Sequence, residues 1–236
     1  NFRAEVKYRL KIDYETLRQA HPSLIYASIS GFGQDGPYRS RPGVDQIVQG
    51  TSGLMSLTGA ADGPPMRVGI AISDTSAGMF LGQGILLALI ERSKTGEGQW
   101  VHTSLLEAML SKLDFQAARY TMSGETPGRV GNDHPTFSPM GVFEAADGFV
   151  NIAASTTKMF RAFCEALSQP QLAQDPRCET GPGRLAHRQV LNAAINECTR
   201  VLTMQALVQL LNLIGCPCGP IYSVSEAFQD PQVQHL

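Results

Sequence analysis

The order of apolar and polar residues in the first half of the chain alternates between helical and extended spacing. Some stretches repeat apolar positions at helical intervals, and others are short β-type runs bounded by glycine or proline. This pattern predicts helices at 13–20, 45–55, 75–92 and 105–122, and strands at 24–30 and 99–104. Asp13 is in the N-cap position of the first helix, and Gly50 and Gly53 interrupt the second. Strands that alternate with helices indicate an α/β domain with an open parallel sheet.

The second half of the chain has a different pattern. Asp147-Gly148 separates two β-like runs within 142–154, which predicts a hairpin. Amphipathic helices are predicted at 157–167, 185–198 and 204–214. A segment rich in glycine and proline lies between the halves. The predicted organisation is a large α/β domain at 1–122, a linker and active-site loop at 123–140, a small α+β domain at 141–223, and the start of a return linker at 224–236.

Composition and charge then remove several classes of protein. Of the 236 residues, 43% are hydrophobic and 17% are charged, which disfavours a disordered segment, a coiled coil and a collagen-like chain. The formal net charge of -2 leaves no basic footprint for nucleic acid or an anionic membrane. We therefore expect a small-molecule ligand, with neither nucleic acid nor a membrane as partner.

Three further features bear on location. The uncharged run at 75–90 is shorter than the ~20 residues that a membrane span needs, so we expect a buried helix. No basic segment followed by an apolar run opens the chain, and we predict no secretory signal. Five cysteines, an odd number in a chain too large to need disulfides, indicate reduced thiols and a cytoplasmic location.

Two motifs that suggest cofactors are better explained as turns. Gly31–Gly36 matches the dinucleotide pattern G-x-G-x-x-G, but Pro37 and Pro42 prevent the helix that should follow. The single C-x-C pair at Cys216–Cys218 does not supply the paired thiolates of a structural zinc site. We interpret these cysteines as inert thiols and predict no metal site.

Asp74 is the candidate catalytic residue that the pattern itself isolates. It is the only charged residue between Val68 and Ile90, so we expect its carboxylate to be buried or half-buried. Its position before Thr75-Ser76 also suits a helix N-cap. A cap and a nucleophile are compatible roles, because a helix start favours an ionised carboxylate. For His134, in the glycine and proline segment, a ligand-facing role and an exposed loop imidazole both stay open.

Five motifs remain to be interpreted together: Asn1-Phe2-Arg3, Leu24–Gly33 with Gly36-Pro37, Arg67–Met79, Lys94–Gln99 and Pro217–Pro220. Together they resemble the family III CoA-transferases, the group that includes formyl-CoA and carnitine CoA-transferases and shares a superfamily with α-methylacyl-CoA racemase. They occur in family order over essentially the whole chain. The resemblance implies an acyl-CoA:carboxylate CoA-transferase with a CoA-binding domain, of which this chain holds part, and a homodimer of interlocked subunits.

The resemblance also implies roles for individual residues. Asp74 would be the nucleophile, forming a mixed anhydride with the acyl group and then an aspartyl-CoA thioester. Asn1, Phe2 and Arg3 would contact CoA, and Arg9 would lie near its phosphates, although a solvated basic patch is the alternative for Arg9. Gly131 and His134 would belong to a substrate loop, where backbone N–H groups are natural oxyanion donors. CoA enters as the thioester substrate, alongside a small carboxylic acid, and no bound cofactor is expected.

Two departures from the family pattern leave alternatives open. Val44 stands where racemases of the superfamily carry a histidine, which disfavours a racemase or epimerase because proton exchange at carbon needs two positioned groups. His102 stands where an acidic residue is more usual, with an effect that the pattern does not predict. Family members also have segments before Asn1 and after Leu236, so an inactive fragment is the third hypothesis.

Overall fold

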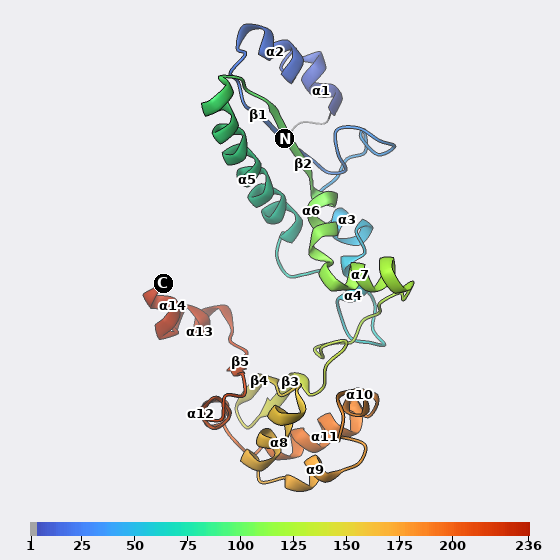
Figure 1. The fold of residues 1–236 in the computed structure, drawn as a ribbon, viewed down its shortest axis with the longest axis vertical. Coiled ribbons are helices and arrows are strands. Elements are labelled where there is room, and N and C mark those ends of the chain that lie inside the picture. The colour runs from blue at the N-terminus through green and yellow to red at the C-terminus, as the bar shows by residue number, and fades with distance from the viewer. Residues whose placement is uncertain (1–3) are drawn as a thin grey trace. The chain divides into compact units, whose positions relative to one another are not determined.

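The computed structural model describes residues 4–236, which form two compact units, 4–131 and 132–236. Each unit has its own small sheet and its own apolar core (Figure 1). The boundary between the units falls inside the segment 123–140, which was predicted to be a linker.

The first unit is built on two strands and seven helices among its described residues. The strands are β1 (Tyr26–Ser30) and β2 (Trp100–Ser104). The helices are α1 (Ala4–Arg9), α2 (Tyr14–Ala20), α3 (Asp45–Thr51), α4 (Leu54–Leu57), α5 (Ile72–Thr95), α6 (Leu105–Lys112) and α7 (Asp114–Ser123). The predicted cap is confirmed, since Asp13 accepts a hydrogen bond from the Thr16 amide. The helix predicted at 105–122 is instead two helices, because Asp114 has a positive φ of 49° that ends regular α6 geometry.

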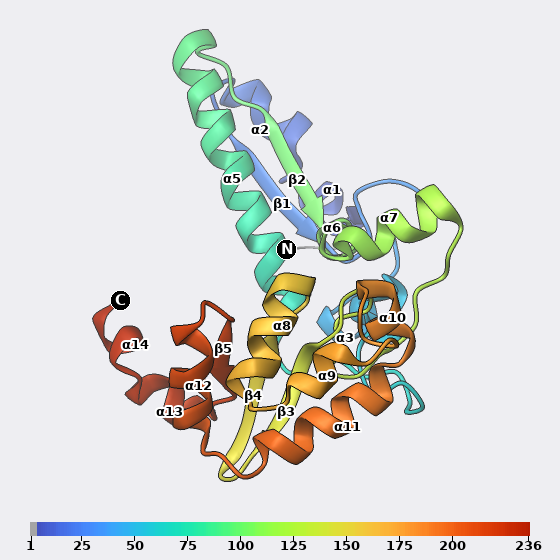
Figure 2. The same cartoon turned by 60° about the horizontal axis from the view of Figure 1, so that its bottom comes forward.

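The two strands of this unit pair in parallel, as predicted. Tyr26 is opposite Trp100, and Ser30 is opposite Ser104. Helix α5 lies along both strands (Figure 2). The contact is close at Gly84, where an added Cβ would lie 2.5 Å from Cγ1 of Val101 on β2. A residue without a side chain is therefore what allows α5 to approach the sheet here.

The opposite face of the sheet carries an aromatic cluster. The ring centroids of Tyr14, Tyr26 and Trp100 lie 6.2–6.5 Å from one another. The Trp100 indole donates a hydrogen bond to Oγ of Ser28 at 2.8 Å, and the ammonium of Lys7 lies 3.9 Å from the centroid of the Trp100 ring. Helices α1 and α2 thus cover this face, while α5 covers the other.

The second unit is an antiparallel sheet with helices packed against it. Its strands are β3 (Met140–Ala145), β4 (Gly148–Ala153) and β5 (Cys218–Pro220), in the order β3-β4-β5. Its helices are α8 (Thr157–Ala166), α9 (Pro170–Gln174), α10 (Gly181–Ala186), α11 (Arg188–Thr199), α12 (Met204–Leu213), α13 (Val224–Gln229) and α14 (Pro231–His235). The predicted hairpin is confirmed, with Asp147-Gly148 at its turn. Strand β5 was not predicted, and residues 224–236 form two helices where a linker was expected.

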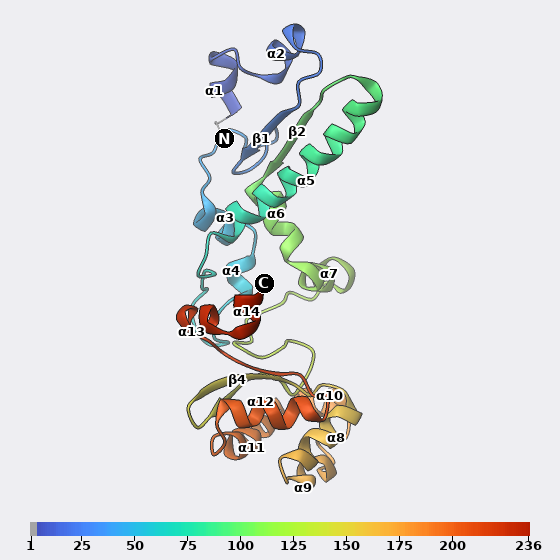
Figure 3. The ribbon, with the colours of Figure 1, turned by 90° about the vertical axis from the view of Figure 1, so that its left-hand side faces the viewer.

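Apolar side chains from the strands and helices of this unit form one core. Helices α8, α11 and α12 lie on one side of the sheet (Figure 3). The buried side chains include Phe143, Val150, Ile152, Phe160, Phe163, Leu191, Ile195, Leu207 and Leu211. The alternation of buried and exposed residues along β3 and β4 shows why the hairpin could be recognised in the sequence.

A buried arginine lies beside this core. Arg184 is 1% exposed, and its guanidinium donates hydrogen bonds to the carbonyl oxygens of Ser138 at 2.9 Å, Cys178 at 3.0 Å and Ser155 at 2.7 Å. It also lies 4.8 Å from the centroid of the Phe160 ring. One side chain therefore connects three separate loops through carbonyl acceptors.

Helix α5 is the one helix in residues 4–236 whose length and composition would allow it to cross a membrane. It has 24 residues, and 22% of its most apolar window is buried. A single helix of this kind is weak evidence for a membrane span, because core helices of globular proteins can have the same length and composition. The expectation of a buried helix holds only for the faces of α5 that pack on β1, β2, α3 and α6, because Met79, Leu86 and Leu87 on α5 are more than 60% exposed.

Replacing Arg184 with Met is expected to lower the free energy of unfolding by about 3 kcal/mol, because three buried carbonyl oxygens lose a charged donor. Urea denaturation of the purified chain measures this loss. The matched control is Arg161→Met on the exposed side of α8, with an expected change within about 0.5 kcal/mol. Equal small changes in the two variants would contradict this account of Arg184.

Two glycines of α5 give a second test of packing. Gly82 has no atom within 4 Å of an added Cβ, so Gly82→Ala is expected to raise the free energy of unfolding by about 0.5–1 kcal/mol through helix propensity. Gly84→Ala forces its Cβ against Val101 and is expected to lower that energy by about 1–3 kcal/mol. Thermal melts of both variants measure the contrast, and a stabilised Gly84→Ala variant would show that α5 does not pack on β2 in this way.

Candidate active site at the end of strand β1

A cleft of about 520 Å³ opens in the first unit at the carboxyl end of β1. It is lined by Ala27, Ile29, Ser30, Gly31, Gly43, Val44, Asp74, Leu81 and Leu105. The carboxyl ends of parallel strands are where open α/β sheets bind ligands, because the connections splay apart there. The position and size of this cleft suit a small-molecule site.

The floor of the cleft depends on two glycines from different segments. An added Cβ on Gly31 would lie 2.7 Å from Cα of Gly43. The backbone after β1 therefore touches the backbone before α3 directly. This contact leaves Val44, which is 64% exposed, at the wall of the cleft.

Asp74 lies in this cleft, but not in the way that the sequence predicted. It is the third residue of α5, whose N-cap residue is Ala71, and its side chain is exposed. The expectations of a buried carboxylate and of an N-cap were both wrong. Within residues 4–236 its carboxylate has no hydrogen-bond or ion-pair partner, and it is the only ionisable side chain that lines the cleft.

The carboxylate that does bind the start of α5 belongs to Asp45, the first residue of α3. Asp45 is 9% exposed and accepts hydrogen bonds from the amide of Ser73 at 2.8 Å, the hydroxyl of Ser73 at 2.7 Å and Nε2 of Gln49 at 2.7 Å. Burial raises the pKa of Asp45, but these hydrogen bonds and the Arg67 guanidinium outweigh it and hold the pKa below its usual value. Asp45 is therefore a carboxylate held by three strong hydrogen bonds, whereas the Asp74 carboxylate has no such partner among the described residues.

Sequence reasoning missed Asp45. Its neighbour Val44 was considered, but only as the position where racemases carry a histidine. Its partner Ser73 is 28 residues away in the chain, and no pattern in the sequence connects the two. The only sequence signal for Asp45 was its place at the start of a predicted helix. Acidic residues are common at helix N-termini, so this signal does not single it out.

Of the four predicted CoA contacts, the structure describes Arg9 alone. Asn1, Phe2 and Arg3 lie outside the described residues. Arg9, at the end of α1, is exposed. Lys7, which the sequence analysis did not select, is buried, and its Nζ donates to Oε1 of Gln34 at 2.6 Å. Burial lowers the pKa of Lys7, with the charge of Asp13 opposing that effect.

The two residues of the predicted substrate loop belong to different units. Gly131 has a positive φ of 66°, and its amide donates to the carbonyl of Gly59 at 3.1 Å. It does not line the Asp74 cleft. His134, in the second unit, is half-buried, and its Nδ1 accepts from the Thr136 amide at 3.2 Å. Burial and the charge of Arg188 lower the pKa of His134, which favours the neutral imidazole.

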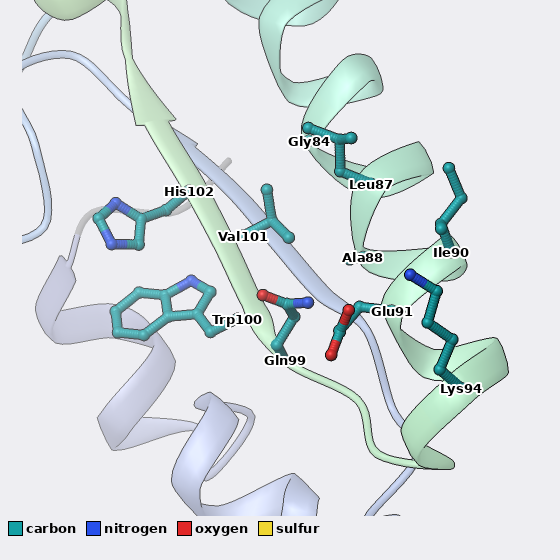
Figure 4. A pocket seen from close by; sticks show the side chains of 10 residues that line it. All are labelled: Gly84, Leu87, Ala88, Ile90, Glu91, Lys94, Gln99, Trp100, Val101 and His102. Carbon is teal, nitrogen blue, oxygen red and sulfur yellow. The ribbon is translucent and has the colours of Figure 1, made fainter.

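His102 is exposed on β2 and packs on a tryptophan. Its ring centroid lies 4.8 Å from that of Trp100. Figure 4 shows both rings on the side of β2 away from α5, whereas Val101 points toward α5. A second hollow, of about 660 Å³, lies between the last turns of α5 and the start of β2, with Glu91 and Lys94 at its edge. Asp74 does not line it, so His102 and Asp74 belong to different sites.

The cysteines behave as the sequence analysis interpreted them. All five are free thiols, and burial raises the pKa of Cys164 to about 12 and that of Cys216 to about 11. Thiols with raised pKa values are poor nucleophiles. In the part of the chain that the structure describes, no three His, Cys, Asp or Glu side chains gather closely enough to hold a metal ion.

Comparison with known proteins gives concordant results. The model of CoA-transferase family III matches residues 1–236. A succinate–glutarate CoA-transferase of Agrobacterium fabrum is 41% identical over 234 residues, which are 99% of this chain and 58% of that protein. An acetyl-CoA:oxalate CoA-transferase of Acetobacter aceti is 40% identical, over 98% of this chain and 60% of that protein.

A solved structure of another protein has a similar fold. The crystal structure of a CAIB/BAIF family protein from Brucella suis matches with a TM-score of 0.88 and 38% identity, over 100% of this chain and 62% of that one. The chain thus spans about three fifths of the length of these relatives. A match of the family model from the first residue to the last, with relatives of this identity, shows that the chain belongs to the family III CoA-transferases.

Proposed function

We propose that the full-length protein transfers CoA from an acyl-CoA to a small carboxylic acid, with Asp74 as the nucleophile. The observation that carries this proposal is the Asp74 carboxylate itself, which is exposed, unpartnered among the described residues and set in the cleft at the end of β1. Two of the relatives named above are a succinate–glutarate CoA-transferase and an acetyl-CoA:oxalate CoA-transferase, which supports the reaction class.

The reaction divides one difficult exchange into easier steps. An oxygen of Asp74 attacks the thioester carbonyl, the C–S bond breaks, and CoA thiolate leaves a mixed anhydride. The thiolate then attacks the Asp74 carbonyl, which releases the donor acid and forms an aspartyl-CoA thioester. The acceptor carboxylate attacks that thioester, the C–S bond breaks, and CoA thiolate leaves a second mixed anhydride. The thiolate then attacks the acceptor's carbonyl in this anhydride, which forms the new acyl-CoA and frees Asp74. Each step is a substitution at a carbonyl, so no electron donor or acceptor is required.

The surroundings of Asp74 suit these steps. The walls of the cleft include the aliphatic side chains of Ile29, Val44, Leu81 and Leu105. An acyl group bound against these walls displaces water from the anhydride and thioester, both of which hydrolyse. No described side chain in the cleft neutralises the carboxylate, so its oxygens remain available to an acyl carbon.

Other parts of the proposal extend beyond the cleft. CoA is held through Asn1, Phe2, Arg3 and Arg9 and enters only as a thioester substrate, without a bound cofactor. Gly131 and His134 contribute to a loop that contacts the acyl group. The full-length protein works in the cytoplasm as a homodimer. These assignments rest on the family resemblance and on the exposure of Arg9.

A racemase or epimerase is the second candidate, and the cleft favours it less. Proton exchange at the α-carbon needs an acid and a base on opposite faces of that carbon. Val44 provides an aliphatic wall beside Asp74, where a second titratable group would be needed. Incorporation of solvent deuterium into the α-position of an acyl-CoA, without movement of CoA between acids, would favour this candidate.

Replacing Asp74 with Asn in the full-length protein is expected to reduce kcat for CoA transfer at least about 1,000-fold, because an amide cannot form the anhydride. Transfer of CoA from succinyl-CoA to a panel of carboxylic acids measures the loss. Asp62→Asn changes an exposed carboxylate that does not line the cleft and is expected to leave kcat unchanged. Undiminished transfer by the Asp74 variant would refute the proposal.

Chemical trapping tests the covalent intermediate separately. Hydroxylamine attacks an acylated or thioesterified aspartate and leaves a hydroxamate on it. Peptide mass spectrometry is expected to find this modification at Asp74 only when acyl-CoA and hydroxylamine are both present. If succinyl-CoA is consumed while Asp74 remains unmodified, the transfer proceeds without an aspartyl intermediate.

A further inference from the structure

Two side chains of α3 reach across to the segment that leads into α5. Asp45 and Gln49 are four residues apart, so they lie on the same face of the helix. They are 9% and 0% exposed, and both bind the segment Val68–Ser73. We call this pair the Asp45–Gln49 clamp.

Gln49 makes the clamp rigid because both ends of its amide are engaged. Its Oε1 accepts from the Val68 amide at 2.9 Å, and its Nε2 donates to Asp45 Oδ2 at 2.7 Å and to the Ile70 carbonyl at 3.3 Å. Turning the amide over would place its oxygen against two oxygens and its NH₂ against an N–H group. Gln49 therefore has one orientation, and it fixes Asp45 in turn.

Asp45 supplies the cap that α5 itself lacks. Ala71, at the N-cap position, has no side chain that can accept a hydrogen bond. The Ser73 amide donates to Asp45 Oδ1 instead. Ser73 is fully buried and Asp74, the next residue, is exposed, so holding Ser73 sets the direction in which Asp74 leaves the helix.

The same carboxylate also ties the two sides of the cleft together. Gly43 and Val44 line the cleft, and Asp45 follows them directly. Its hydrogen bonds with Ser73 thus join the Gly43-Val44 wall to the helix that carries Asp74. Asp45 itself does not line the cleft.

We propose that Asp45 is a positioning residue for CoA transfer: through the Asp45–Gln49 clamp it holds the first turn of α5 so that the Asp74 carboxylate faces the cleft. It contacts neither the acyl group nor CoA. Its role as an aid to catalysis rests on the proposed function of Asp74, whereas its role in fixing the helix start does not. A displacement of about 1 Å at a reacting group can cost about 100-fold in rate, so a cap at this position matters more than an ordinary cap.

The first experiment measures the helix start without using activity. In the full-length protein, Asp45→Asn is expected to speed hydrogen–deuterium exchange of the peptide around Ser73 at least about tenfold, because Asn removes the charge and turns one acceptor into a donor. Exchange in the middle of α5 is expected to stay unchanged. The matched control is Asp13→Asn, which removes a buried capping carboxylate from α2 and is expected to leave exchange at the start of α5 unchanged.

The second experiment separates positioning from stability. Asp45→Asn is expected to lower kcat about 10–100-fold with KM for acyl-CoA within about threefold, and Asp45→Ala is expected to lower kcat further because no acceptor remains. Asp13→Asn is expected to lower the melting temperature by about as much as Asp45→Asn does, while kcat stays within about twofold of the unmodified protein. Both variants are measured well below their melting temperatures.

The outcomes distinguish this inference from the proposed function. Unchanged exchange near Ser73 in Asp45→Asn overturns the clamp, whatever the activity. Faster exchange with an unchanged kcat overturns the positioning role. If the Asp74→Asn variant keeps full transfer activity, the proposed function fails, and the exchange measurement still decides whether Asp45 holds the start of α5.

Discussion

The parallel pairing of β1 with β2 is the constraint on which the arrangement of the first unit depends. A chain that forms two adjacent parallel strands must return between them, and the returning helix then runs antiparallel to the strands. Helix α5 makes this return, so its first turn lies at the carboxyl edge of the sheet. Asp74 is in that turn. The geometry of a parallel pair therefore brings an acidic side chain to the edge where α/β sheets bind their ligands.

Two aspartates near that edge have the same chemical group but different burial and different hydrogen-bond partners. Asp45 is buried, and its oxygens accept hydrogen bonds from Ser73 and Gln49. Asp74 is exposed and lines an otherwise uncharged cleft. A carboxylate whose lone pairs are occupied by donors is a structural acceptor, whereas one without partners retains its nucleophilic oxygens. The hydrogen-bonded Asp45 carboxylate can therefore hold the helix start that carries Asp74.

The second unit achieves its stability by different means. Its core is an antiparallel hairpin covered by amphipathic helices, and its loops are connected by the guanidinium of Arg184. A planar cation with several donors is suited to collecting carbonyl groups that have no partner in a sheet or helix. Each unit has its own core, and the residues that line the cleft at the end of β1 all belong to the first unit.

The sequence by itself determined the succession of helices and strands, the parallel α/β character of the first unit, the hairpin at Asp147-Gly148, and the family through its motifs. These features are local, since they follow from the spacing of apolar residues, from turn residues and from short runs of identity. The break at Asp114, the strand β5 and the burial of Asp45 in place of Asp74 were decided only by the tertiary structure. A sequence shows that a carboxylate is unusual among its neighbours in the chain, but burial depends on which distant segments pack around it. Here a contact across 28 residues, between Asp45 and Ser73, determines which aspartate is buried and which remains free.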